Sequence, residues 1–457
     1  MPLPSTDPGR QLPELPPGFE LGVSSTAYQV EGAVEEDGRG PSVWDVFTAK
    51  PGSVRDSSTG AVAADHYHRR SEDVALLARL GVDAYRFSVS WPRIQPHGRG
   101  LLNAAGCSFY DRLVDELLEA GIKPVVTLHA WDLPQTLQED GGWLNPGTVE
   151  AFAQYAARLG DLLGDRVAHW IPIDEPNVLA FMGYATGRHA PGFALGFDAL
   201  HASHHLLLGH GRAVVALRES GVRSIGCANN HAPMWPVSDD EADVGATKLV
   251  DALWNAMFLE PMLLGRYPAD LVPLLEPIVE DGDLAVIRQP LDFYGVSYYA
   301  PHKIGATSEE AEVPFEECEL LGYPRTASGL AVVPDALREW LITFRARYRA
   351  ALPPLVITGY GASTLAGPEV SREEALADGE RVEHLDAHLQ AVATACRRGV
   401  DVRGFFARSF LDGFEWAAGH THAYGLVHVD PRTGARTPKD SFSWFASVIA
   451  AQTASRG

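Results

Sequence analysis

The sequence has few of the features that mark disulfide-bonded, zinc-binding or membrane proteins. Its 457 residues contain four cysteines, Cys107, Cys227, Cys318 and Cys396, which lie far apart and form no CxxC pair. This spacing indicates neither a zinc site nor a disulfide framework. No apolar run approaches the roughly eighteen residues of a membrane span, and the Pro-rich residues 1–18 include no apolar stretch of signal-peptide length. The sequence therefore predicts a cytoplasmic protein with reduced thiols.

Basic residues are scarce relative to acidic ones. The chain has 37 Lys and Arg residues against 59 Asp and Glu residues, so its formal net charge is −22 at pH 7. This balance favours solubility and argues against binding of nucleic acid or anionic membranes by charge alone. We therefore expect a small-molecule substrate, and neither a nucleic-acid nor a membrane partner.

One local pattern recurs along the chain. An amphipathic helical stretch ends at a glycine, and a short apolar run rich in strand-forming residues follows within two or three residues. The pattern occurs at Gly81, Gly121, Gly221 and Gly399. Glycine adopts the left-handed conformation that ends many helices. Strands that alternate with helices predict parallel pairing in an α/β sheet.

Eight strands are expected in all. Eight parallel strands alternating with helices predict a single (β/α)8 TIM barrel, whose active site lies where the strands end and the βα loops begin. The predicted strands cover residues 19–25, 84–88, 124–128, 167–173, 224–229, 292–298, 355–358 and 402–410.

Three βα loops are long and acidic, at residues 232–246, 305–328 and 361–380, and we expect them to wall the mouth of a pocket. No linker divides the chain. We predict a barrel domain over residues 19–450, flanked by an N-terminal tail (1–18) and a C-terminal tail (451–457).

Six motifs follow one another through nearly the whole chain. In order they read FELGVSSTAYQVEGA, DHYHRRSEDVALLARLGVDAYRFSVSWPRI, WDLPQTL, GRHAPG, DFYGVSYYAP and LDGFEWAAGHTHAYGLVHVD. Together they resemble the successive signatures of glycoside hydrolase family 1, the β-glucosidase family. The resemblance implies a TIM barrel with two catalytic glutamates at the ends of strands four and seven. In that family one glutamate is the general acid and base, and the other attacks the sugar.

The resemblance places the general acid and base at Glu175. The segment reads WIPIDEP where the family has Asn-Glu-Pro, so Asp174 replaces the asparagine. The family nucleophile lies in the motif Ile-Thr-Glu-Asn-Gly, and here the matching residues 357–361 read Ile-Thr-Gly-Tyr-Gly. The nucleophile position is therefore Gly359, followed by Tyr360. We expect ordinary retaining β-glucosidase activity to be absent.

Other sugar-contacting positions of the family are kept in part. The residues that match the family pattern are Gln29, Arg86, Tyr299, Glu415 and Trp416. The residues that depart from it are Ala130 (His in the family, with His129 before it and Trp131 after it), Ser297 (Asn), Arg408 (Trp) and Gly413 (Asn). The departures crowd the strand ends, while the motifs that build the scaffold stay intact.

From this pattern we predict a catalytic group and a substrate-binding group. The predicted catalytic residues are Glu175, Asp174 and Tyr299. The predicted substrate-binding residues are Gln29, Arg86, His129, Trp131, Arg408, Glu415, Trp416 and Tyr360, around the vacated nucleophile position Gly359. No metal or organic cofactor is expected, because the chain has no HExxH motif, no zinc spacing and no phosphate-binding glycine loop at a βα junction.

Structural roles are the alternative for several of these residues. Asp174 would then only bond to a neighbouring backbone amide. We favour packing for Tyr360, which would fill the space that the nucleophile leaves, and for His129, which would face the core or pair with Asp132. Tyr299 has lost its usual carboxylate acceptor, so its hydroxyl needs a substrate, a water or another side chain if it is buried.

Three functions fit this pattern. The first is a glycosidase-derived enzyme in which Glu175 is the acid and a 2-acetamido group of the substrate replaces the enzyme nucleophile, in volume that Gly359 frees. The second is a non-hydrolytic acid–base enzyme of specialised metabolism that catalyses an elimination, cyclisation or isomerisation. The third is a catalytically dead sugar-binding pseudoglycosidase. Because Glu175 is present, we predict an enzyme that acts on a glycoside or a polar small molecule.

The pocket floor is also expected to carry one uncompensated positive charge. Arg86 braces the nucleophile carboxylate in the family, and here that carboxylate is missing. Relative to the family pocket, Arg408 adds a second positive charge, and Asp174 adds one negative charge where the family has asparagine. Such a floor would bind an anionic group, unless Arg408 pairs with Asp174 or Glu415 and Arg86 faces water.

Overall fold

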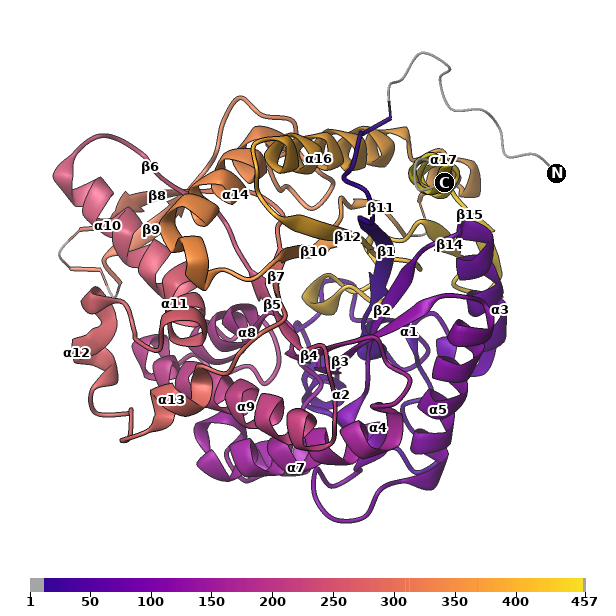
Figure 1. The fold of residues 1–457 in the computed structure, drawn as a ribbon, viewed down its shortest axis with the longest axis horizontal. Coiled ribbons are helices and arrows are strands. Elements are labelled where there is room, and N and C mark those ends of the chain that lie inside the picture. Colours follow the sequence, from indigo (N-terminus) through magenta and orange to yellow (C-terminus); the bar gives the residue numbers. More distant parts are fainter. Residues whose placement is uncertain (1–11, 309, 312, 368, 455–457) are drawn as a thin grey trace.

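Eight parallel strands form a barrel in the computed structural model, which describes residues 12–308, 310–311, 313–367 and 369–454 (Figure 1). The strand order is β4-β3-β2-β1-β12-β10-β7-β5. Parallel bridges from Trp170 to Ile225 and from Asp174 to Ala228 join the two end strands. The bounds are β1 (Glu20–Ser25), β2 (Ala84–Ser88), β3 (Lys123–His129), β4 (His169–Ile173), β5 (Gly226–Asn230), β7 (Phe293–Ser297), β10 (Leu355–Tyr360) and β12 (Val402–Arg408).

All eight predicted strands are confirmed, each within two residues of its predicted bounds. The reason is their burial: every residue of β2, β5 and β7 is buried. Strands covered on both faces tend to be rich in apolar residues, and the helix-ending glycines mark where β2, β3, β5 and β12 begin. The prediction of a single TIM barrel is confirmed with them.

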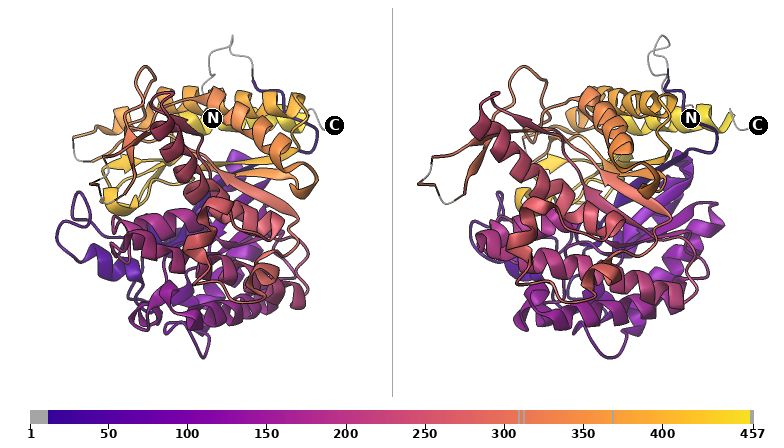
Figure 2. Two further views of the ribbon diagram at one scale, coloured as in Figure 1. Left: turned by 90° about the vertical axis from the view of Figure 1, so that its left-hand side faces the viewer. Right: turned by 60° about the vertical axis from the view of Figure 1, so that its left-hand side comes forward.

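Helices lie around the outside of the strands, and Figure 2 shows this arrangement from two further sides. The four predicted helix-ending glycines, Gly81, Gly121, Gly221 and Gly399, have φ values between 75° and 86°, as the left-handed conformation requires. The longer helices are α3 (His66–Leu80), α5 (Ala104–Glu119), α7 (Pro146–Leu163), α9 (Leu200–Glu219), α14 (Pro334–Tyr348), α16 (Gly379–Arg397) and α17 (Asp440–Ala454).

The long βα loops carry small elements of their own. β6 (Met234–Pro236), β8 (His302–Ala306) and β9 (Phe315–Cys318) form a three-stranded sheet beside α10 (Glu241–Asp251). Of the three loops predicted to wall the pocket, Ser328 is the one described residue that lines the cavity at the carboxyl ends of the barrel strands. The cavity wall is therefore built mostly by other loops, because these three fold into sheets and helices of their own.

Both described chain ends pack onto the barrel. Residues 1–11 of the predicted N-terminal tail and residues 455–457 of the predicted C-terminal tail lie outside the described residues. α17 continues past the predicted boundary at 450 to Ala454, and Gln452 Nε2 donates a hydrogen bond to the carbonyl of Pro16 at 2.8 Å. In the part of the chain that the structure describes, no helix combines the length and apolar character that a membrane crossing needs.

Candidate active site

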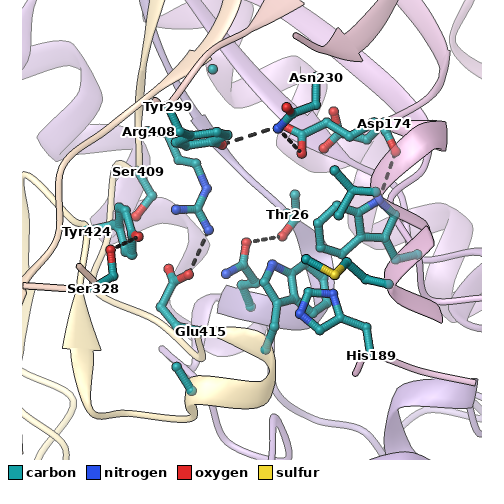
Figure 3. A pocket seen from close by; sticks show the side chains of 18 of the residues that line it. Thr26, Asp174, His189, Asn230, Tyr299, Ser328, Arg408, Ser409, Glu415 and Tyr424 are labelled. Atoms are coloured by element: carbon teal, nitrogen blue, oxygen red, sulfur yellow. Dashed lines mark hydrogen bonds and ion pairs between the residues drawn. The ribbon is translucent and has the colours of Figure 1, made fainter. Parts of the chain in front are cut away.

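A cavity of about 550 Å³ opens at the carboxyl ends of the barrel strands (Figure 3). Its volume falls in the range of small-molecule sites, and its position is the one where TIM barrels place their chemistry. Ten of the twelve predicted site residues line it, because the strand ends that carry them converge there. They are Gln29, Arg86, Trp131, Asp174, Glu175, Tyr299, Gly359, Arg408, Glu415 and Trp416.

The other two predicted residues, His129 and Tyr360, lie in the core. His129 is completely buried and packs among aromatic rings, of which Trp143 lies 5.6 Å away between centroids. Tyr360 stacks on His388 at 4.0 Å. Side chains alternate between the two faces of a strand, so Tyr360 points away from the cavity that its neighbour Gly359 faces. These buried positions fit a packing role for His129 and Tyr360 and do not fit contact with a substrate.

Glu175 lies two residues after the end of β4 and is the N-cap of the short helix α8 (Pro176–Val178). Its backbone is left-handed, with φ 42°, a conformation that costs a non-glycine residue about 1–3 kcal/mol and clusters at functional sites. Asn230 Nδ2 donates to Glu175 Oε2 at 3.2 Å, and the Tyr299 hydroxyl donates to Oε1 at 3.5 Å. Burial, together with the negative charge of Asp174, raises the pKa of Glu175 to about 7. A general acid at neutral pH needs such a pKa.

Asp174 forms an ion pair with Arg86 of β2. Arg86 Nη2 donates to Asp174 Oδ1, Nε donates to the Thr127 hydroxyl at 3.1 Å, and Nη1 donates to the carbonyl of Thr358 at 2.9 Å. The three nitrogens of this guanidinium are therefore all bonded to protein atoms. Arg86 does not face water.

Arg408 of β12 points toward Glu415, as Figure 3 shows. Its Nη2 donates to Glu415 Oε2 at 2.7 Å, and its guanidinium lies 4.4 Å from the centre of the Tyr424 ring. Both guanidiniums of the floor are thus paired with carboxylates. The prediction of an uncompensated positive charge there is wrong, because a buried cation without a partner costs several kcal/mol and the chain itself supplies the partners.

Gly359 faces the cavity from β10. A Cβ placed on it would lie 3.2 Å from Ser297 Oγ and 3.6 Å from the Tyr299 hydroxyl. A side chain at 359 would therefore reach Tyr299. In its absence the Tyr299 hydroxyl finds its acceptor in Glu175, which answers the sequence-based question of where this buried hydroxyl bonds.

Asn230 and Trp254 are site residues that the sequence analysis missed. Trp254 Nε1 donates to Asn230 Oδ1 at 3.3 Å, which fixes the Asn230 amide so that its Nδ2 faces Glu175. One signal was available for Asn230: it lies at the carboxyl end of the predicted fifth strand, where barrel active-site residues gather. Trp254 lies in a helical segment that no motif marked.

Within residues 12–454, apart from the three positions that the structure leaves undescribed, no group of three or more His, Cys, Asp or Glu side chains is arranged to hold a metal ion.

Comparisons with known proteins agree over the whole barrel. The sequence profile described as Glycosyl hydrolase family 1 matches residues 11–454. Beta-glucosidase A of Thermotoga maritima is 39% identical over 442 residues, covering 95% of this chain and 98% of its own. Thermostable beta-glucosidase B of Thermobispora bispora is 43% identical over 441 residues, covering 95% and 90%. The crystal structure of the psychrophilic beta-glucosidase BglU from Micrococcus antarcticus matches with a TM-score of 0.91 at 43% identity, over 96% of this chain and 97% of that chain.

Proposed function

Because the chain belongs to glycosyl hydrolase family 1, we propose that it cleaves glycosides with Glu175 as general acid and base and without a protein nucleophile. One observation carries the proposal: a buried Glu175 whose pKa is raised to about 7 faces the same cavity as a glycine at position 359. The acid of the family is thus available, while the position of its second carboxylate has no side chain.

Substrate-assisted cleavage of a 2-acetamido glycoside fits this arrangement. Glu175 donates its proton to the glycosidic oxygen, and the electron pair of the breaking C1–O bond moves to that oxygen. The carbonyl oxygen of the 2-acetamido group attacks C1, so a cyclic oxazolinium ion forms in place of a glycosyl–enzyme ester. Water then attacks C1 and gives a proton to the Glu175 carboxylate, and the ring opens to restore the acetamido group.

Asp174 is suited to orient that acetamido group. Its Oδ1 accepts a hydrogen bond from Arg86, whereas no residue that the structure describes donates to Oδ2, and the side chain lines the cavity. Oδ2 can therefore accept the acetamido N–H, which makes the acetamido carbonyl a better nucleophile. Gly359 lines the same cavity and has no side chain that would compete with the group.

A second candidate is non-hydrolytic acid–base chemistry on a molecule other than a sugar. The observation that favours it is that protein partners already occupy two family sugar contacts. Gln29 donates to the Phe414 carbonyl and accepts from Thr26, and Glu415 accepts from Arg408. A substrate would have to compete with these bonds for the same polar atoms.

The test compares para-nitrophenyl β-glycosides that differ only at position 2 of the sugar. We expect negligible hydrolysis of the β-glucoside and measurable hydrolysis of its 2-acetamido analogue. Glu175→Gln should lower the latter by a factor of about 10²–10⁴, the usual contribution of a general acid. β-Glucoside turnover near that of ordinary family members would contradict the missing-nucleophile mechanism. Inactivity toward the 2-acetamido analogue would favour the second candidate.

Restoring a glutamate at position 359 is a sharper test. Gly359→Glu alone should recover little β-glucosidase activity, because Arg86 is already paired with Asp174. In Gly359→Glu/Asp174→Asn the Arg86 guanidinium is free to pair with the new carboxylate. We expect this pairing to stabilise the transition state by the equivalent of one pKa unit, so the double variant should be about tenfold more active than the single variant. Gly359→Gln/Asp174→Asn is the matched control, with the same shape and no nucleophile, and should stay inactive. Equal activity of the single and double variants would contradict the role given to Arg86.

A further inference from the structure

A recess of about 430 Å³ adjoins the cavity. Ala300, His302 and Leu330 line both spaces, so a ligand can extend from one into the other. The recess lining is mostly polar, with a smaller apolar part formed by Pro301 and Leu320 beside the shared residues. The recess can therefore hold the apolar body of a molecule whose other end lies in the cavity.

The recess lies on the same side of Glu175 as its hydrogen-bond partner Asn230. Asn230 links the Glu175 carboxylate to the Trp254 indole, and the Trp254 and His302 rings lie 6.1 Å apart. A row of side chains thus leads from the acid to the recess. A group that receives the Glu175 proton and departs on this side meets Trp254 and His302 first.

Cations outnumber carboxylates in the lining of the recess, although the chain carries a net charge of −22. Its lining includes Arg188, Lys303 and Arg325 against Glu317 and Glu319, three positive charges to two negative. Arg325 pairs with Glu319 at 2.9 Å, and Glu317 is bonded to His302 at 2.5 Å.

Lys303 is half-buried, and its side-chain ammonium has no ion pair or hydrogen bond to any described residue. Arg188 is exposed and has no ion pair within the described ranges, although its charge acts on Glu317. Arg55, which lines the cavity itself, is likewise without an ion pair in the described part of the chain. The outer part of the site is thus positive, whereas the two guanidiniums of the floor are neutralised.

We propose that the recess binds the leaving group of the substrate and that this group carries a carboxylate on an apolar body. The inference rests on the proposed function for the direction in which the leaving group departs. Its charge follows from the recess alone: among the described residues Lys303 and Arg188 have no ion-pair partner, and the apolar part of the wall contacts the body of the group. A neutral sugar on the floor and an anionic leaving group match the two halves of the site.

The test measures equilibrium binding by titration calorimetry, so that it does not depend on turnover. The ligands are two thioglycosides of 2-acetamido-2-deoxy-β-glucose, with para-carboxyphenyl or para-carbamoylphenyl as the aglycone, and the two corresponding free phenols. We expect the carboxylate to bind about five- to tenfold more tightly than the amide, because each partly exposed cation contributes about two- to fivefold. This preference should shrink as salt screens the charges.

Substitutions test whether Lys303 and Arg188 cause the preference for the carboxylate. Lys303→Met and Arg188→Gln should each reduce the carboxylate preference about two- to fivefold and leave amide binding unchanged. Arg223→Gln is the matched control: Arg223 is exposed between α9 and β5 at the opposite end of the barrel, so its loss should change neither affinity.

The outcomes separate this inference from the proposed function. Equal binding of carboxylate and amide would overturn the inference, as would a preference that survives Lys303→Met combined with Arg188→Gln. If the thioglycosides fail to bind while the free carboxyphenol binds in a Lys303-dependent way, the recess is supported and the sugar of the proposed function is wrong. Absence of binding by all four compounds overturns the inference.

Discussion

At the scale of single residues, two causes raise the pKa of Glu175, and substitution can separate them. Burial is the larger cause, and the negative charge of Asp174 adds to it. Asp174→Asn removes the charge and keeps the burial, so the pKa of Glu175 should fall from about 7 toward its usual range. Because a general acid must be protonated, the alkaline limb of kcat/KM should then move to lower pH.

Carboxyl ¹³C NMR measures the same pKa without a substrate, with the Glu175 signal assigned by its absence in Glu175→Gln. Asp140→Asn, which removes a carboxylate from an exposed ion pair with Arg99, is the control and should leave the Glu175 titration where it is. An unchanged Glu175 titration in Asp174→Asn would remove Asp174 from the mechanism.

His129 is a buried residue whose replacement should stabilise the protein. Neither of its ring nitrogens has a hydrogen-bond partner among the described residues, and an unsatisfied buried polar group costs about 1–3 kcal/mol. Burial lowers the pKa of His129 from 6.5 to about 3. Below pH 6.5 the unfolded chain therefore gains a proton that the folded chain does not, and the free energy of unfolding falls by about 1.4 kcal/mol per pH unit.

We expect His129→Phe to raise the free energy of unfolding by about 1 kcal/mol at pH 7 and by about 2 kcal/mol more at pH 5, as measured by urea unfolding. His388→Phe is the matched control. The pKa of His388 is also lowered to about 3, but its Nδ1–H donates to the His384 carbonyl at 2.8 Å. His388→Phe should show the same additional increase in the free energy of unfolding at pH 5, but no increase at pH 7. Identical changes in both variants at pH 7 would contradict the explanation.

At the scale of elements, an ion pair ties the end of β12 to the loop that precedes the helical turn η7 (Trp416–Ala418). Arg408 supplies the guanidinium, and burial raises the pKa of its partner Glu415 against the opposing effect of Arg408. Arg408→Met should destabilise the protein by about 3 kcal/mol, because it leaves a buried carboxylate unpaired. Arg408→Met/Glu415→Gln should recover most of that loss. Urea unfolding of the unsubstituted protein, the two single variants Arg408→Met and Glu415→Gln, and the double variant gives the coupling energy, and a value near zero would contradict the pairing.

The strands and the strand-end residues were predictable from the sequence, whereas the partners of those residues were not. A buried strand can be predicted because it is rich in apolar residues. Residues at or just after the carboxyl end of such a strand, such as Glu175 and Gly359, then face the cavity. Which carboxylate meets which guanidinium depends on side-chain directions across strands far apart in the chain. The spacing left open whether Arg408 would pair with Asp174 or with Glu415, and the structure selects Glu415. In the structure Asp174 forms its ion pair with Arg86.

At the scale of the whole molecule, charge is distributed unevenly. The chain carries −22 overall, the cavity floor holds two neutralising ion pairs, and the recess lining carries three cations against two carboxylates. A surplus of negative charge destabilises a compact state through self-repulsion. The positive recess is therefore not apparent from the average composition, and an anionic ligand meets less repulsion there than the net charge of the chain suggests.

The same surplus charge predicts how salt affects stability. Raising NaCl from about 0.01 M to about 0.1 M shortens the screening length from about 30 Å to about 10 Å, which weakens repulsion among the excess carboxylates. At pH 7 we expect the midpoint of thermal unfolding to rise by about 2 °C, the shift that roughly 1 kcal/mol produces in a large domain. The control is the same titration near the sequence isoelectric point of about 5.1, where little net charge remains to be screened and the shift should largely vanish. Equal shifts at both pH values would mean that salt acts through something other than net charge.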